Sequence, residues 1–112
     1  MIISFLMFAG KQNITNWLQK ANMTELSNNE CQRIYDPIAQ VEVIESQLCA
    51  SSPIHADSCM GDSGGSLQYR INDTFYVTGV VSFGVGCSSS LPGVHARVSS
   101  YIEWIENIVW PQ

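Results

Sequence analysis

The sequence predicts an all-β domain that closes with a helix. The apolar runs are short, turn-forming residues separate them, and only the last run has helical spacing. Many short strands followed by one helix are typical of a β-barrel or a β-sandwich. The 112 residues are 46% hydrophobic, so we expect one folded domain with one modest core.

Six segments are predicted to be strands. The run at Leu18–Leu26 is the weakest, with Leu18, Met23 and Leu26 as its possible core positions. The fourth and fifth segments flank the turn Ile71-Asn72-Asp73, which indicates a hairpin. In chain order the segments are Ile2–Ala9, Leu18–Leu26, Gln47–Ala50, Ser66–Arg70, Thr74–Phe83 and Val94–Val98.

Two helices are expected. Ser27-Asn28-Asn29-Glu30 forms a capping box, which predicts a short helix to about Ile34, ended by Asp36-Pro37. At the C-terminus, Ser100 and Glu103 form a second box. The apolar face that follows is expected to pack in the core; it comprises Tyr101, Trp104, Ile105 and Ile108.

Charge argues against several classes of partner. Ten acidic and five scattered basic residues give a net charge of -5, which does not favour binding to nucleic acid or to an anionic membrane. The apolar segment Met1–Gly10 is too short to span a bilayer and lacks a positive leader, so it is interpreted as a buried strand rather than a signal peptide. No cofactor is expected.

Four cysteines indicate an oxidising compartment, and by themselves they allow three disulfide pairings. They are Cys31, Cys49, Cys59 and Cys87. No C-x-x-C pair and no His at ligand spacing is present, so no metal site is predicted. N-glycosylation sequons at Asn13, Asn22 and Asn72 further support a secreted protein.

The segment Gly61–Gly65 carries the chemistry. Ser63 stands among small residues, and the N–H groups of Gly61 and Ser63 are able to converge on one oxyanion. No upstream His or Asp is placed to activate the serine, and an unassisted hydroxyl is a poor nucleophile. The α/β-hydrolase elbow is a weaker alternative, with Asp73 and His95 in the right order. That fold requires a helix after the elbow, whereas a hairpin follows here.

Together with flanking motifs, this segment resembles the C-terminal half of a chymotrypsin/trypsin-type serine protease. The resemblance covers nearly the whole chain and implies one domain, 1–112, without the family's N-terminal barrel. It implies an antiparallel six-stranded Greek-key β-barrel with a short intermediate helix and a C-terminal helix. The matching motifs are Cys59–Leu67, Val81–Gly84, Pro92–Val98 and Ser99–Ile105, with weaker matches at Leu18–Ala21, Cys31 and Leu48–Ala50.

The resemblance also implies roles for single residues. Ser63 is the nucleophile, Gly61 supplies an oxyanion-hole N–H, and Asp57 is the acid of a pocket for Lys or Arg. The remaining substrate-binding residues are Ser58 beside Asp57, Ser82 on a strand that pairs with the substrate, and Gly84 and Gly93 in the pocket walls. The implied disulfides are Cys31–Cys49 and Cys59–Cys87.

The chain departs from the family pattern in the residues that would complete the active site. The catalytic His, the catalytic Asp and the activating N-terminus are missing, which leaves Asp62 without its ion-pair partner. His55 and His95 are interpreted as a loop residue and a packing residue rather than as a substitute base. Gly10-Lys11-Gln12 replaces a common Gly-Trp-Gly, and Ser66 replaces a common Pro.

The expected function is trypsin-like endopeptidase activity on peptides with Lys or Arg, through an acyl-enzyme on Ser63. The His and Asp would come from the N-terminal barrel, encoded by the same gene or carried by a separate chain. The alternative is a non-catalytic homologue that acts as a binding or decoy module. A barrel without its partner exposes an apolar face, so the isolated chain is expected to aggregate or dimerise.

Overall fold

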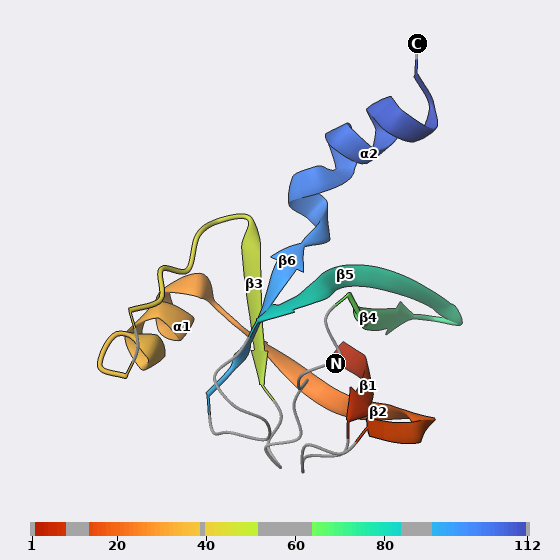
Figure 1. The fold of residues 1–112 in the computed structure, drawn as a ribbon. Helices are drawn as coiled ribbons and strands as arrows, with labels where there is room; N and C mark the ends of the chain where they lie inside the picture. Colours follow the sequence, from red (N-terminus) through yellow and green to blue (C-terminus); the bar gives the residue numbers. More distant parts are fainter. Residues whose placement is uncertain (1, 9–13, 39, 52–63, 84–90, 112) are drawn as a thin grey trace.

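The computed structural model describes residues 2–8, 14–38, 40–51, 64–83 and 91–111, with the backbone alone for 2–8, 14–19 and 21. Figure 1 shows the arrangement of the strands and helices. The strands are β1 (Ile2–Phe8), β2 (Ile14–Leu26), β3 (Gln47–Ser51), β4 (Ser66–Ile71), β5 (Thr74–Phe83) and β6 (Gly93–Arg97). The helices are α1 (Asn28–Tyr35), the 3-10 turn η1 (Val98–Tyr101) and α2 (Ile102–Val109).

The six strands form a closed barrel in the order β1-β2-β3-β6-β5-β4. Every neighbouring pair is antiparallel, and β1 closes the barrel on β4 through three residue pairs, from Ile2 with Tyr69 to Ser4 with Leu67. The predicted six-stranded antiparallel barrel is therefore confirmed. It also excludes the helix that an α/β-hydrolase elbow requires, because β4 follows the serine segment directly.

The strand bounds differ from the prediction mainly at β2. This strand begins at Ile14 rather than Leu18, because its ladder with β1 starts where Phe8 pairs with Ile14. Pairing with a partner strand thus extends β2 through residues whose own pattern is weak. The strand predicted at Val94–Val98 lies one residue earlier, as β6.

The β4–β5 hairpin extends beyond the barrel body (Figure 1). Ile71 pairs with Thr74 across the turn Asn72-Asp73, and Asn72 adopts a φ of 56°. Asn tolerates this left-handed conformation better than most residues do. Both faces of the hairpin tip are open to solvent, since residues 70–77 are all exposed.

Two apolar clusters make up the described core. One contains Met23, Leu48, Ala50 and Leu67, with Tyr69 packed against it. The other lies under α1 and contains Cys31, Tyr35, Cys49, Leu91 and Val94. Met23 is therefore a core residue, as predicted, and Leu26 packs half-buried against the second cluster.

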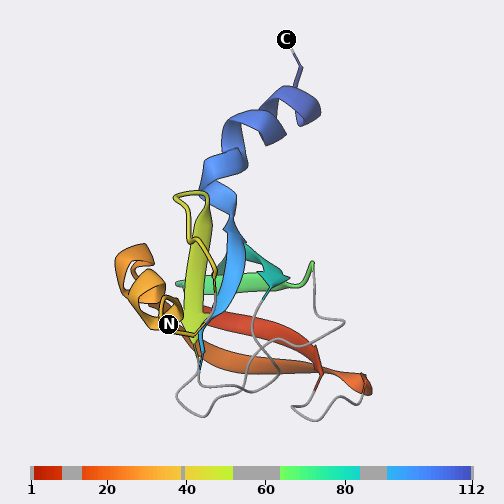
Figure 2. The ribbon, with the colours of Figure 1, turned by 60° about the vertical axis from the view of Figure 1, so that its left-hand side comes forward.

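Helix α1 begins at its predicted cap. The Ser27 Oγ accepts a hydrogen bond from the Glu30 N–H at 3.2 Å, and the helix ends at Tyr35, just before Asp36-Pro37. It lies beside the barrel in both ribbon views (Figures 1 and 2). Its buried residues are Cys31 and Tyr35.

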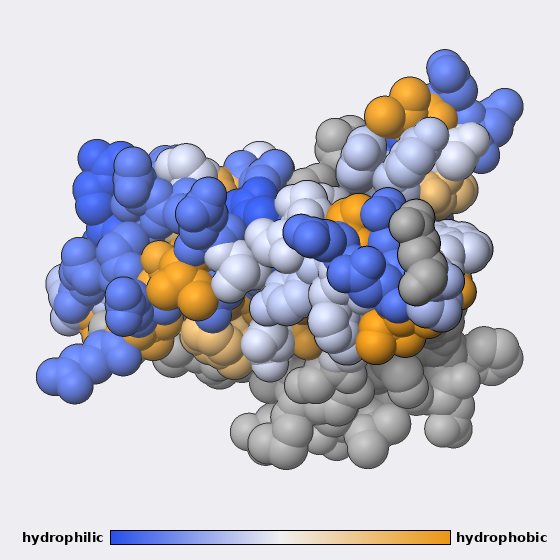
Figure 3. All heavy atoms as spheres, turned by 90° about the horizontal axis from the view of Figure 1, so that it is seen from above, coloured by the Kyte–Doolittle hydropathy of each residue, from blue (hydrophilic) through white to orange (hydrophobic). Residues whose placement is uncertain are grey.

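Helix α2 projects away from the barrel in both views, and two predictions about it are wrong (Figures 1 and 2). Ser100 does not cap the helix, because it lies inside η1; Tyr101 is the cap residue and makes no capping side-chain bond. The apolar face is not core, since Trp104 is 64% exposed and Ile108 is 63% exposed. Figure 3, viewed from the side on which α2 projects, shows hydrophobic residues at the surface.

Candidate active site

Most of the predicted site residues lie outside the described part of the chain. These are Asp57, Ser58, Gly61, Ser63 and Gly84, together with His55, Asp62, Cys59, Cys87 and the sequon residue Asn13. The described segments that border them are the end of the serine segment, the end of β5 and the start of β6.

Two hydrogen bonds fasten the residues after Ser63 to β5. The Gly64 N–H donates to the Val81 carbonyl at 3.0 Å, and the Val81 N–H donates to the Gly65 carbonyl at 2.8 Å. Gly64 has a φ of +88°, a conformation that L side chains rarely adopt, so this glycine is required by the backbone. The chain that follows the candidate nucleophile is thereby held one residue from Ser82.

Ser82 lies at a β-bulge. Val81 pairs with His95 and Phe83 pairs with Val94, so the register shifts across Ser82. The ladder with β4 ends at Val80, opposite Ser66. Ser82 is exposed, and it is not one of the residue pairs of either described ladder. A bulge of this kind leaves a strand residue available for contacts outside the sheet.

Gly93 is buried at the start of β6, where it pairs with Ala50 of β3. The residue before it is supported from α1, because the Tyr35 hydroxyl donates a hydrogen bond to the Pro92 carbonyl. Leu91 is also buried, in the cluster under α1. Helix α1 therefore supports the segment that leads into Gly93.

The disulfide between Cys31 and Cys49 is present, with a Cα–Cα distance of 6.3 Å. It joins α1 to β3, and Cys49 pairs with Val94 on the neighbouring strand. One of the two implied pairings is thus confirmed. The other, Cys59–Cys87, lies outside the described residues.

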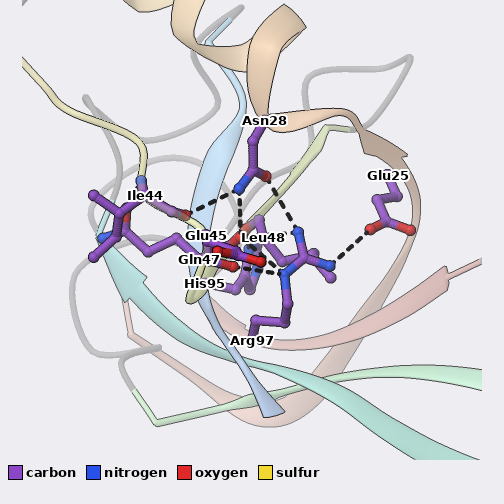
Figure 4. Close-up of polar contacts among 8 residues, drawn as sticks. All are labelled: Glu25, Asn28, Ile44, Glu45, Gln47, Leu48, His95 and Arg97. Carbon is purple, nitrogen blue, oxygen red and sulfur yellow. Dashed lines mark hydrogen bonds and ion pairs between the residues drawn. The ribbon is translucent and has the colours of Figure 1, made fainter. Parts of the chain in front are cut away.

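A polar network around Arg97 joins β6, α1 and the chain before β3 (Figure 4). The guanidinium donates to the carbonyls of Glu45 and Gln47 and to the Asn28 side chain at 2.9–3.2 Å. Its Nη1 lies 3.6 Å from a Glu25 carboxylate oxygen. Asn28 in turn donates to the carbonyls of Ile44 and Gln47. No role was predicted for Arg97, although it lies within the motif Pro92–Val98.

His95 is 1% exposed and lies on β6 between Leu48 of β3 and Val81 of β5. Its Nδ1 lies 3.3 Å from the Leu48 carbonyl, and Nε2 has no hydrogen-bond partner among the residues that the structure describes. Burial lowers its pKa below the ordinary value of 6.5, and backbone hydrogen bonds to Leu48 and Gly93 oppose that change in part. This environment agrees with the packing role expected for His95.

The described residues hold no group of three His, Cys, Asp or Glu side chains able to bind a metal. Within the same residues, neither α1 nor α2 has the length and hydropathy to cross a bilayer.

Comparison with known proteins identifies the family. A family model described as Trypsin matches residues 7–105. Serine protease Hayan of Drosophila melanogaster is 49% identical over 73 residues, which cover 62% of this chain and 12% of that protein. CLIP domain-containing serine protease C9 of Anopheles gambiae is 33% identical over 106 residues, which cover 82% of this chain and 30% of that protein. The chain thus spans less than a third of the length of each relative.

Proposed function

We propose, because this chain belongs to the trypsin family, that it is the nucleophile-bearing half of a serine endopeptidase. The substrates of such a protein are peptides and proteins, and the cleaved bond follows Lys or Arg. The observation that carries the proposal is the paired hydrogen bonding of Gly64 and Gly65 to Val81, beside the Ser82 bulge. It fastens the segment after the candidate nucleophile to the strand that is expected to bind the substrate backbone.

In the proposed reaction, the Ser63 hydroxyl attacks the peptide carbonyl and its proton passes to a His from outside this chain. The N–H groups of Gly61 and Ser63 hold the oxyanion. The amine then leaves with that proton, and water hydrolyses the acyl-enzyme at Ser63. The fixed backbone at Gly64 and Gly65 supports this step, because a nucleophile held in one position loses less freedom when it reacts.

The proposed specificity rests on Asp57. A carboxylate in a desolvated pocket favours a cationic side chain, because only an opposite charge offsets its loss of hydration. Gly93 is proposed as a wall of this pocket. It lies at the start of β6 opposite Ala50 and follows Pro92, whose carbonyl accepts a hydrogen bond from Tyr35. Ser58 and Gly84 are proposed to complete the pocket.

The exposed face of α2 supports the proposal that residues 1–112 form only part of the protease domain. Trp104, Ile108 and Trp110 are 63–70% exposed, and such a patch favours association. We propose that the N-terminal barrel of the family covers this face and supplies the missing His and Asp. The Cys31–Cys49 disulfide and the sequons support an extracellular location.

The test uses the natural secreted product that contains this sequence. We expect a fluorophosphonate probe to label Ser63, and an Arg-containing peptide amide to be cleaved in preference to its Phe analogue. Ser63→Ala should abolish both, whereas Ser99→Ala, at an exposed position in η1, should change neither. Asp57→Ser should remove the preference for Arg while labelling persists.

Intact mass identifies the form that carries the activity. A deglycosylated product larger than 12.4 kDa that is labelled by the probe supports the two-barrel enzyme. A product of 12.4 kDa that resists the probe would contradict the proposal and favour a binding or decoy role.

A further inference from the structure

The tip of the β4–β5 hairpin combines an N-glycosylation sequon with an exposed apolar surface. Asn72-Asp73-Thr74 is one of three sequons in the chain. All three of its residues are exposed, and Asn72 is in the left-handed conformation at the turn. This position lies beyond the barrel body (Figure 1).

Arg70 holds the turn in place through contacts with the turn backbone and with Asp73. Its Nε donates to the Asn72 carbonyl at 2.6 Å, and its Nη2 lies 2.9 Å from the Asp73 carboxylate. The guanidinium carbon also lies 6.0 Å from the centre of the Phe75 ring. These described contacts leave the Asn72 side-chain amide free, so a firmly held turn presents it to solvent.

Asn22 provides a contrast within the same chain. It is exposed, but it pairs with Ile3 in the β1–β2 ladder, and the next residue, Met23, is 1% exposed in the core. N-glycans are attached to a chain that is still folding, so folding competes with the modification. Folding places the Asn22 tripeptide in a strand ladder and against the core, whereas it leaves the Asn72 turn accessible.

Apolar side chains surround the base of the turn on both faces of the hairpin. Tyr69 and Tyr76 stack with their ring centres 5.4 Å apart. The exposed fractions are 50% for Ile71, 54% for Phe75, 45% for Tyr76 and 49% for Val77. An apolar patch of this kind favours association unless something covers it.

We propose that Asn72 is an N-glycosylation site, that Asn22 is not modified, and that the Asn72 glycan covers the apolar surface of the hairpin tip. A glycan is bulky and strongly hydrated, yet its sugar rings have apolar C–H faces that pack on aromatic side chains. The inference goes beyond the proposed function and requires of it only passage through the secretory pathway.

The sequence makes the test direct. The five basic residues place the sequons in separate tryptic peptides, namely 12–20, 21–33 and 71–97. The full-length secreted product is treated with peptide N-glycosidase in heavy-oxygen water, which marks each formerly glycosylated Asn as labelled Asp. After reduction and digestion, we expect the mark in peptide 71–97 and its absence from peptide 21–33.

Two substitutions at one position provide the matched control. Thr74→Ser keeps the sequon and should keep the mark, whereas Thr74→Ala destroys the sequon and should remove it completely. An unmarked 71–97 peptide in secreted wild-type protein, or a marked 21–33 peptide, would overturn the proposal. The wild-type peptide map decides this even if the Thr74→Ala variant fails to fold.

Removal of the glycan tests the covering role. Enzymatically deglycosylated protein should bind more hydrophobic dye than untreated protein, and unchanged binding would refute this part of the proposal. Probe labelling at Ser63 is a separate readout. Labelled protein with unmodified Asn72 contradicts the glycan proposal alone, and glycosylated protein without labelling contradicts the proposed function alone.

Discussion

The two α-helices have eight residues each and opposite relations to the barrel. Helix α1 has the polar sequence NNECQRIY, yet it buries Cys31 and Tyr35. Helix α2 has the apolar sequence IEWIENIV and buries no residue within the described structure. The more polar helix is therefore the better packed one.

Specific bonds explain the difference. Helix α1 is held by a disulfide, and Gln32 and Asn28 bond to backbone groups at Val41, Val43, Ile44 and Gln47. Helix α2 follows η1 without a side-chain cap. An apolar face shows that a helix needs a partner, but it does not show which part of a protein supplies that partner.

Removing the disulfide gives the largest expected effect on this contrast. Cys31→Ala with Cys49→Ala should lower the free energy of unfolding by about 3 kcal/mol, because the bridge restricts the unfolded chain across a sequence separation of 18 and holds α1 on β3. The measurement is urea denaturation of the chain. An unchanged midpoint would mean that the polar bonds alone hold α1.

Loss of the Arg97 network should be the next largest effect. Arg97→Lys removes the planar guanidinium that contacts Glu45, Gln47 and Asn28. The free energy of unfolding should fall by about 1–3 kcal/mol. Arg70→Lys is the matched control, because its ion pair with Asp73 is exposed, and we expect a change under about 1 kcal/mol. Equal losses for the two variants would contradict a special role for Arg97.

His95 should make stability depend on pH. Its folded pKa is lowered, so as the pH falls below 6.5 the unfolded chain binds a proton that the folded chain does not, and stability decreases. The slope contributed by this residue is at most about 1.4 kcal/mol per pH unit. Denaturation between about pH 5 and 7 should show a flatter profile for His95→Phe than for wild type; parallel profiles would refute the assignment.

Substitutions on α2 should have the smallest effect on the chain itself. Trp104→Ala and Ile108→Ala remove side chains that are already exposed, so stability should change by less than about 0.5 kcal/mol. Hydrophobic dye binding should decrease in both variants. A large loss of stability would show that α2 packs on the barrel in solution and would break the contrast with α1.

Local sequence signals predicted the elements well, but not their surroundings. The Ser27 cap and the Asn72 turn depend on a few adjacent residues, and both are found where expected. The start of β2 is set by its pairing with β1, where Ile14 meets Phe8, and the pattern of β2 alone placed it four residues late. The Ser100 cap failed because Val98–Tyr101 form a 3-10 turn first.

The residue types of the candidate site suggest its chemistry, but they do not predict the contacts that hold it in place. The residues around Ser63 indicate a nucleophile, and this stays a prediction because they lie outside the described residues. The bonds from Gly64 and Gly65 to Val81 and the contact of Tyr35 with Pro92 join segments far apart in sequence. No local pattern specifies such contacts, and the same is true of the Arg97 network.

The barrel seam between β1 and β4 has a consequence for the order of folding. Ile2 meets Tyr69 across that seam, so closure must bring together two distant parts of the chain, and long-range pairing of this kind is slow. The α1–β3 unit joins cysteines only 18 residues apart and forms from local contacts. We therefore expect α1 and β3 to assemble early, and the chain to remain an open sheet with free edges until β1 reaches β4.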